Sequence, residues 1–180
     1  MKLSTRARYG LRMMVELARE LKTENLVRLG KIAQITGLSE NYLAQLAIPL
    51  KGEGLLVGVS GKYGGYRLSK SADKIYVSDV LDAVIGKINL VECAADPSIC
   101  LNSSFCETRL IWVLLKESIS DILKKYTLAD LIDKGYHQKM RNFYPGIKLL
   151  HPDEVMAGMD DDVTSGCPVQ IKPRKKNKYN

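Results

Sequence analysis

Residues 26–56 read "LVRLGKIAQITGLSENYLAQLAIPLKGEGLL", and this stretch decides the fold class. Two helices that cross steeply need a small residue at the crossing, a glycine that turns the chain, and apolar residues that seal the pair. Ala33 supplies the small residue, and Gly37 supplies the turn, where a left-handed backbone suits glycine best. Ser39 is a good N-cap for the second helix. The sealing positions are Ile32, Leu38, Leu43 and Leu46. The stretch predicts a helix-turn-helix, with an ordinary helical hairpin as the alternative.

The flanking segments extend this pattern. "GLLVGVSGKYGGYRLSK" (54–70) reads as a strand, a glycine-rich turn and a second strand. A hairpin directly after a helix-turn-helix makes a winged helix, whose second helix enters the major groove while the wing reaches the backbone or minor groove. Upstream, residues 4–21 form an amphipathic helix. Its expected apolar face is Tyr9, Leu11, Met14, Val15, Ala18 and Leu21. We therefore expect a winged helix-turn-helix DNA-binding domain over residues 1–72.

Candidate DNA contacts fall into two groups. Exposed residues at the start of the second helix can reach bases, since Asn and Gln pair with adenine and Glu accepts from cytosine. These are Ser39, Glu40, Asn41, Tyr42 and Gln45, with stacking on sugar and phosphate as the alternative for Tyr42. Contacts to phosphates add affinity without sequence preference. The remaining candidates, on the first helix, after the second helix and on the hairpin, are Lys2, Arg6, Arg8, Lys51, Lys62, Tyr63 and Arg67.

The charge distribution agrees with a polyanion partner. The net charge is +7, and residues 1–70 hold 12 Lys and Arg against 5 Asp and Glu. Residues 71–171 hold 10 against 15, and the last nine residues hold 5 against none. Excess positive charge in one segment is typical of nucleic-acid binding, although a solvated basic face gives the same count.

The second half predicts a dimer. Residues 73–86 give a strand-like "KIYV" and a short helix capped by Ser78. After Cys106 a long helix carries apolar residues at three- and four-residue spacing. These are Leu110, Ile111, Leu114, Leu115, Ile119, Ile122 and Leu123. A small winged helix cannot cover so long an apolar stripe, so we expect this helix to form a dimer interface. Burial of the stripe inside the monomer is the alternative. A two-fold dimer would match a palindromic operator. "TLADLIDKG" (127–135) begins with a capping box and stops at Gly135.

Three of the four cysteines lie in the pattern C-x6-C-x5-C, at Cys93, Cys100 and Cys106. No apolar run reaches the roughly 18–20 residues that cross a bilayer, and no signal-peptide core follows Met1. We therefore expect a cytoplasmic protein without membrane contact, in which thiols stay reduced. Zinc sites generally use closer cysteine pairs, so the wide spacing favours an iron–sulfur cluster. Three incidental cysteines are the alternative.

The expected organisation is mainly α with a small β-wing. Residues 73–136 hold the cysteine loop and the dimerisation helices, and residues 137–180 are expected to form a largely disordered tail. A solvated tail is favoured over one that adds nonspecific DNA affinity. An enzyme is not expected, because no nucleophile–base pair, P-loop or dinucleotide fingerprint is visible.

Together, "MKLSTRARYGLRMMVELA", the helix-turn-helix, "GKYGGYRL" and the three cysteines resemble the bacterial winged-helix regulators that include IscR, NsrR and CymR. The resemblance covers about residues 1–135. It implies a homodimeric transcription factor, usually a repressor. In cluster-binding members the cysteine loop holds a 2Fe–2S or 4Fe–4S centre, of which we favour 2Fe–2S, and senses iron–sulfur supply, nitric oxide or oxidants.

Two departures from the resembling family concern the fourth cluster ligand. Arg109 stands where IscR-like proteins have a ligating His, and Arg8 stands where some NsrR-like proteins have an acidic ligand. The candidates that remain are Glu107, Glu92, Asp96, His137, His151, Cys167 or a small exogenous molecule. Cys167 is the best ligand chemically, but it lies in the expected tail.

Two further departures concern DNA. Ala44 stands where IscR has a Glu that discriminates between operators, and Ser60 stands where IscR has a wing Arg. We expect a different operator, with Lys62 carrying the minor-groove contact.

The main hypothesis is therefore a homodimeric DNA-binding regulator whose operator affinity is controlled by a cluster on Cys93, Cys100 and Cys106. The alternative is a cluster-free winged-helix regulator controlled by thiol oxidation or by a partner metabolic enzyme.

Overall fold

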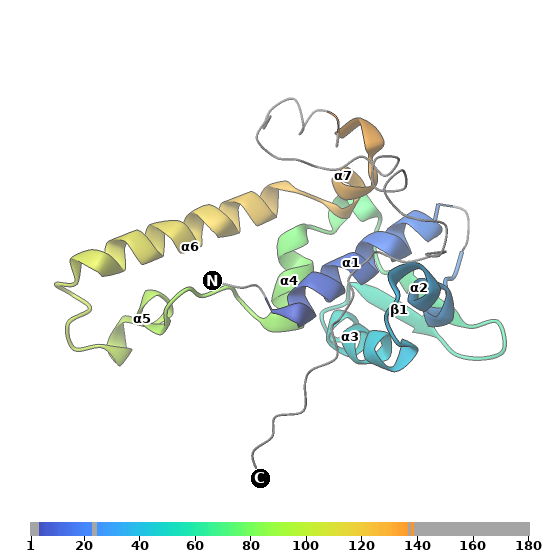
Figure 1. The fold of residues 1–180 in the computed structure, drawn as a ribbon, viewed down its shortest axis with the longest axis horizontal. Helices are drawn as coiled ribbons and strands as arrows, with labels where there is room; N and C mark the ends of the chain where they lie inside the picture. Colours follow the sequence, from blue (N-terminus) through green and yellow to red (C-terminus); the bar gives the residue numbers. More distant parts are fainter. Residues whose placement is uncertain (1–3, 23–24, 137, 139–180) are drawn as a thin grey trace, which may run out of the picture.

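The computed structural model describes residues 4–22, 25–136 and 138. Its elements in chain order are α1 (Thr5–Glu20), α2 (Leu29–Thr36), α3 (Glu40–Gly52), β1 (Leu56–Val59), β2 (Gly65–Leu68), η1 (Ala72–Lys74), α4 (Val77–Ile85), α5 (Glu92–Ala95), η2 (Pro97–Ile99), α6 (Glu107–Lys125) and α7 (Leu128–Ile132). The described part is mainly helical with one two-stranded sheet, which confirms the predicted fold class. Figure 1 shows α1 to α4 and the sheet gathered at one end, with α6 projecting from them.

The helix-turn-helix is built as its sequence predicts. Gly37 ends α2 in a left-handed conformation with φ of 70°, and its N–H donates to the carbonyl of Ala33 at 2.8 Å. The hydroxyl of Ser39 accepts from the N–H of Tyr42 at 3.3 Å and so caps α3. Of the sealing positions, Leu38 is half-buried and packs against the core; Ile32, Leu43 and Leu46 are buried. These local signals fix the turn between α2 and α3.

Helix α1 is buried over a wider face than its apolar pattern predicts. Ser4 caps it by accepting from the N–H of Ala7 at 3.1 Å. Met13 and Leu17, which were left out of the predicted apolar face, are completely buried. The reason is that α1 packs against α2 and α3 as well as against α4 and α7. Gly10 lies where α1 meets α4, since a Cβ there would come 2.8 Å from Cγ2 of Val84.

The main core joins the two halves of the described chain. It combines residues of α1, α2 and α3 with Ile75, with Val80 and Val84 of α4 and with Leu128 of α7. It therefore draws on both sides of the boundary that we expected near residue 72.

Three details of the second half differ from the prediction. The "KIYV" segment forms no strand beyond a single bridge between Tyr76 and Thr127, and α4 is capped at Tyr76, whose N–H donates to the carboxylate of Asp79 at 3.1 Å. Ser78 lies inside α4 instead of capping it. Thr127 and Asp130 form the predicted capping box, with the N–H of Asp130 donating to the Thr127 hydroxyl at 3.2 Å. Helix α7 ends at Ile132 and not at Gly135.

Helix α6 buries none of its residues. It packs on α4 and on α5, and Leu123 near its C-terminal end contacts a small cluster of Ala7, Val77 and Leu81. Toward its N-terminal end the helix leaves the body of the molecule (Figure 1). Its exposed apolar residues are Leu110, Ile111, Trp112, Leu114, Leu115 and Ile122. Burial inside the monomer therefore does not account for this stripe.

None of the helices in the described part of the chain has the length and apolar character that a membrane span requires.

Candidate nucleic-acid interface and cysteine loop

The start of α3 presents polar side chains to solvent. Glu40, Asn41 and Gln45 are exposed, while the hydroxyl of Ser39 is committed to capping the helix. The carboxylate of Glu40 lies over the first turn of α2, because a Cβ on Gly30 would come 3.0 Å from Oε1 of Glu40. Of the base-reading candidates, Asn41 and Gln45 are therefore the side chains that this surface leaves free to reach outward.

Tyr42 is held by its neighbours. Its ring is half-buried against the core and meets the ring of Tyr9 edge to face, with centroids 6.1 Å apart and planes at 90°. The guanidinium of Arg8 lies 4.8 Å from the centroid of Tyr9, within cation–π distance. This row of three side chains links the start of α1 to the start of α3. Arg8 and Tyr42, both predicted contacts, are thus brought onto one surface.

The wing carries Lys62 and Tyr63 at its exposed tip. The Lys62 ammonium lies 5.5 Å from the centroid of the Tyr63 ring. Arg28, which is not among the predicted DNA contacts, donates from Nη2 to the carbonyl of Lys62 at 2.9 Å. No local sequence pattern predicts a contact between residues 34 positions apart. The structure thus adds Arg28 to the surface around the wing.

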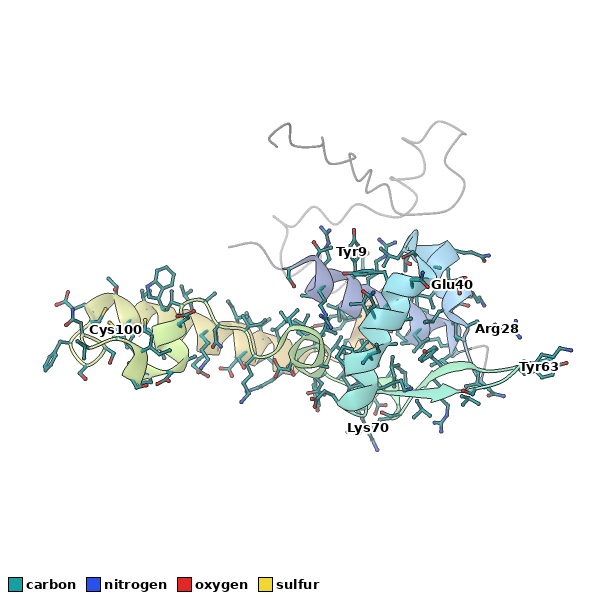
Figure 2. All side chains as sticks on the ribbon, turned by 90° about the horizontal axis from the view of Figure 1, so that it is seen from below. Tyr9, Arg28, Glu40, Tyr63, Lys70 and Cys100 are labelled. Carbon is teal, nitrogen blue, oxygen red and sulfur yellow. The ribbon has the colours of Figure 1, made fainter. Side chains whose placement is uncertain are left out.

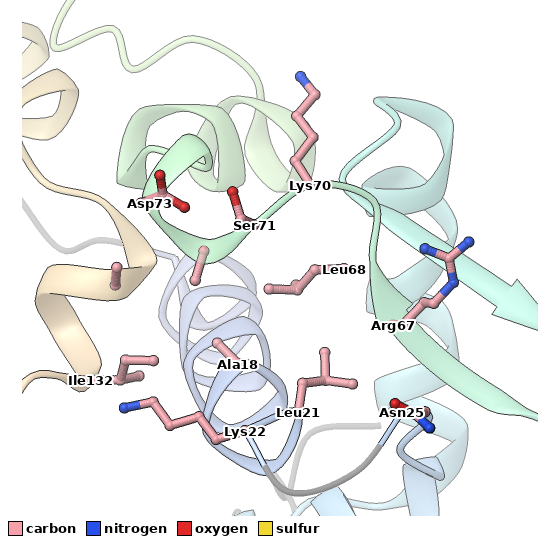
Figure 3. A pocket seen from close by; sticks show the side chains of 12 residues that line it. Ala18, Leu21, Lys22, Asn25, Arg67, Leu68, Lys70, Ser71, Asp73 and Ile132 are labelled. Carbon is pink, nitrogen blue, oxygen red and sulfur yellow. The ribbon is translucent and has the colours of Figure 1, made fainter.

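The other predicted phosphate contacts are spread around this end of the molecule. Arg6, Lys51 and Arg67 are exposed, and Lys2 lies outside the described residues. Arg67 borders a cavity of about 480 Å³ between the end of α1, β2, η1 and α7 (Figure 3). Lys22 and Lys70 border the same cavity, while Leu21 and Leu68 form part of its apolar lining. Basic side chains from the end of α1 and from the segment between β2 and η1 therefore border one cavity beside the wing.

The three loop cysteines are free thiols of intermediate exposure. Cys106 is the residue before α6, and its sulfur shares a hydrogen bond with the hydroxyl of Thr108 at 3.2 Å. This bond lowers the pKa of the Cys106 thiol below its ordinary value, helped by backbone N–H groups of Arg109 and Thr108 and by the Arg109 charge, against some desolvation. Cys106 is therefore the loop thiol whose surroundings favour the thiolate.

Arg109 connects the two ends of the cysteine loop. Its Nε donates to the carbonyl of Cys93 at 2.8 Å, which ties α5 to the first turn of α6. Arg109 thus makes a hydrogen bond to the backbone of the segment that carries another cysteine.

The donor chemistry of the loop fits an iron–sulfur cluster, since three thiols on one segment are soft ligands. Across the described residues, however, no three His, Cys, Asp or Glu side chains already converge on one point where a metal ion could bind. Glu107 is exposed at the start of α6; the candidates His137, His151 and Cys167 lie outside the described residues. The three thiols therefore do not form a ready-made site for a single metal ion in the described part of the chain.

The two candidate sites lie far apart. Figure 2 shows Cys100 at one end of the molecule and Tyr63 at the other, with α6 and the helical body between them. A recognition helix with exposed amides, a wing with a basic tip and basic surroundings define a winged-helix DNA-binding protein.

The chain belongs to the Rrf2 family, whose model, described as "Iron-dependent Transcriptional regulator", matches residues 3–134. The HTH-type transcriptional regulator CymR of Bacillus subtilis is 37% identical over 131 residues, which are 73% of this chain and 89% of the relative. The HTH-type transcriptional regulator IscR of Vibrio parahaemolyticus is 34% identical over 175 residues, 97% of this chain and 99% of the relative.

Solved structures of related regulators have a similar fold. The chain is similar to CymR, the global cysteine regulator of B. subtilis, with a TM-score of 0.61 and 36% identity over 73% of this chain and 96% of that one. It is also similar to T. potens IscR, with a TM-score of 0.60 and 33% identity; the match covers 73% of this chain and 86% of that one. The protein is therefore a transcriptional regulator and not an enzyme, as its sequence predicts.

Proposed function

We propose that the protein is a cytoplasmic, homodimeric repressor that binds a palindromic operator, with an affinity controlled by an iron–sulfur cluster on Cys93, Cys100 and Cys106. The observation that carries this proposal is the position of three free thiols on one loop that leads directly into α6. The family description, an iron-dependent regulator, supports it. A 2Fe–2S centre is favoured over 4Fe–4S, with iron–sulfur status, nitric oxide or redox stress as the signal.

The proposed dimer rests on α6. Six large apolar side chains of this helix are exposed, among them Leu110 at 65% and Leu114 at 52%. Exposed apolar surface of this extent is typical of a subunit interface. A two-fold axis would present two copies of α3 to successive major grooves of a palindromic site.

The proposed DNA contacts are divided by role. Asn41 and Gln45 on α3 read base edges, since their amides can pair bidentately with adenine. Arg6, Arg8 and Lys51 contact phosphates around α3, and Lys62 with Tyr63 contacts DNA from the wing. Lys2, Ser39, Glu40, Tyr42 and Arg67 complete the proposed set.

The residues that would connect the loop to the DNA surface form a continuous path. Arg109 holds the Cys93 segment to α6, α6 packs on α4, and α4 packs on α1 and α3. A cluster would supply a rigid link between the three cysteines. A change in how the loop is held would shift the start of α6, and with it the geometry of the dimer.

A cluster-free regulator controlled by thiol oxidation or by a partner enzyme is the second candidate. The hydrogen bond between Cys106 and Thr108 and the lowered pKa of Cys106 favour it, because the thiolate is the reactive form. One related solved structure is described as the oxidized form of Staphylococcus aureus CymR, 32% identical to this chain.

One experiment distinguishes a cluster-binding regulator from a cluster-free one. The protein is purified anaerobically, its visible absorption spectrum is recorded, and iron and acid-labile sulfide are assayed. We expect visible absorbance with iron and sulfide in the wild type, lost in Cys100→Ser and kept in Ser103→Ala, a control in the same loop. Glu107→Gln and Cys167→Ser test the fourth ligand. A colourless wild type that stays free of iron after reconstitution would contradict the cluster and leave thiol control.

A further inference from the structure

The wing is attached to the segment before α2 at its base. Val27 and Tyr66 form a bridge in which each N–H donates to the other's carbonyl, at 2.9 and 2.8 Å. Gly65 permits this approach, since a Cβ there would come 2.8 Å from the carbonyl oxygen of Val27. The two-stranded sheet therefore gains a short third partner from the chain that leads into the helix-turn-helix.

The next residue attaches the tip of the wing. Arg28 is the N-cap residue of α2, and its Nη2 donates to the carbonyl of Lys62 at 2.9 Å. Lys62 and Tyr63 project from this same tip, and Tyr63 is 77% exposed. Val27 and Arg28 thus hold the hairpin at two points along its length.

We propose that Arg28 is a positioning residue for DNA binding, which holds the wing tip in place relative to the helix-turn-helix so that Lys62 and Tyr63 reach DNA while α3 is in the groove. A two-stranded hairpin has little stability by itself. A tip that is already ordered in the free protein costs less conformational entropy on binding. The proposal rests on the proposed contact between the wing and DNA.

A direct phosphate contact by Arg28 is the competing role. The carbonyl of Lys62 is uncharged, so the guanidinium keeps its positive charge and has further N–H donors. Both roles predict weaker DNA binding when Arg28 is removed. They differ in whether that loss depends on the side chains at the wing tip.

A double-mutant cycle separates the two roles. Arg28→Ala, the pair Lys62→Ala with Tyr63→Ala, and the triple variant are compared by fluorescence anisotropy on a random-sequence duplex pool of about 30 base pairs, enough for two half-sites. The pair removes both side chains and keeps the Lys62 carbonyl. Arg19→Ala, an exposed arginine paired with Glu16 on the same helix, measures the loss of one positive charge. Circular dichroism and thermal unfolding confirm that each variant folds.

We expect Arg28→Ala to weaken binding about three- to ten-fold more than Arg19→Ala, the range that the net contribution of one ordinary hydrogen bond would give. In the background of the wing-tip pair, Arg28→Ala should weaken binding no more than Arg19→Ala does. An equal loss from Arg28→Ala in both backgrounds would overturn the proposal and assign Arg28 to DNA directly.

Hydrogen exchange of the DNA-free protein tests the attachment independently. The N–H of Gly64 donates to the carbonyl of Gly61 at 2.9 Å inside the wing turn. We expect the peptide over residues 60–66 to exchange faster in Arg28→Ala than in wild type; unchanged exchange would overturn the proposal. A different result would be faster exchange of that peptide together with wild-type DNA affinity in the Lys62→Ala, Tyr63→Ala variant. That result would contradict the proposed contact between the wing and DNA, and the positioning role of Arg28 with it.

Discussion

At the scale of single residues, the thiol of Cys106 gives a testable pH dependence. The Thr108 hydroxyl is the main cause of its lowered pKa. A lowered pKa means that the thiolate, the form that reacts with iodoacetamide, persists to lower pH. Thr108→Val should therefore move the midpoint of the alkylation rate of Cys106 to higher pH, whereas Thr108→Ser should keep it low.

The measurement is the rate of alkylation of Cys106 in metal-free protein between about pH 6 and 10, a range that brackets the ordinary thiol pKa, followed by peptide mass spectrometry. If Thr108→Val and Thr108→Ser shared the wild-type midpoint, the hydroxyl would not be what stabilises the thiolate.

Two glycines in helices should respond in opposite directions to the same substitution. A Cβ at Gly10 would lie 2.8 Å from Cγ2 and 3.1 Å from Cγ1 of Val84, a short β-branched side chain that cannot swing aside. Gly10→Ala should lower the free energy of unfolding by about 1–3 kcal/mol, the usual cost of overpacking. Gly52 has nothing within 4 Å of such a Cβ. Gly52→Ala should raise stability by about 0.5–1 kcal/mol, because alanine suits a helix better than glycine.

Urea unfolding of both variants, followed by circular dichroism, checks this pair. Equal stability of the two variants would mean that α1 and α4 can move apart at Gly10 without a loss in the free energy of unfolding.

The residues that the sequence predicts are those with local roles. Gly37 and Ser39 act on backbone within four positions of themselves, so their residue types suffice. Arg28 and Arg109 act across 34 and 16 positions, on backbone carbonyls that exist at every residue. A carbonyl carries no sequence signature, and these two contacts could not have been predicted from the pattern of residue types.

At the scale of elements, the long helix and the winged helix-turn-helix were predictable because their apolar spacing is regular. The "KIYV" segment misled because β-branched and aromatic residues favour strands in general. In the structure Ile75 is completely buried in the core, and its carbonyl accepts from the N–H of Leu128, which begins α7. Packing against α7, which is distant in sequence, decides the conformation of the "KIYV" segment. The residue types of the segment alone do not reveal this packing.

The contact between α5 and α6 gives a prediction for an element. Arg109 is the side chain whose hydrogen bond ties the Cys93 segment to α6. In Arg109→Ala the carbonyl of Cys93 loses that donor, so α5 should loosen and Cys93 should be alkylated several-fold faster, as expected when about 1 kcal/mol of hydrogen bonding is lost. Among the described residues, no hydrogen bond joins Cys100 to Arg109, so the alkylation rate of Cys100 is the internal control.

Alkylation rates for each cysteine in the metal-free protein, read by mass spectrometry, provide the measurement. An equal acceleration at Cys93 and Cys100 would indicate general unfolding of the loop and contradict a specific tie by Arg109.

At the scale of the whole molecule, the two candidate sites lie at opposite ends of the described chain. The wing and α3 lie at one end and the cysteine loop at the other, joined through α6, α4 and α1 (Figures 1 and 2). In the proposed regulator, a signal received by the cysteines would therefore have to travel through helix packing or through a partner subunit. The exposed stripe of α6 makes the second route direct, because a partner that covers it would contact the helix that begins at the cysteine loop.

This arrangement leads to a prediction about assembly. Ile111 and Leu115 lie in the middle of the apolar stripe of α6 and are 51% and 42% exposed. Burying such side chains fully contributes about 1.5–3 kcal/mol each, and a carboxylate in their place would be costly to bury in an interface. Ile111→Asp with Leu115→Asp should therefore convert a dimer into monomers of 20.1 kDa. Affinity for a palindromic duplex should fall with the dimer, because one recognition helix then binds without the other.

Multi-angle light scattering after gel filtration measures the mass, and circular dichroism verifies that the helices remain. Lys124→Asp is the matched control, since Lys124 is exposed on α6 but lies away from the stripe by helical spacing. We expect the control to remain dimeric and the double variant to be monomeric. A wild type that is already monomeric, or a double variant that stays dimeric, would show that α6 is not the dimer interface. The path from the cysteine loop to the DNA surface would then have to run within one subunit, through α4 and α1.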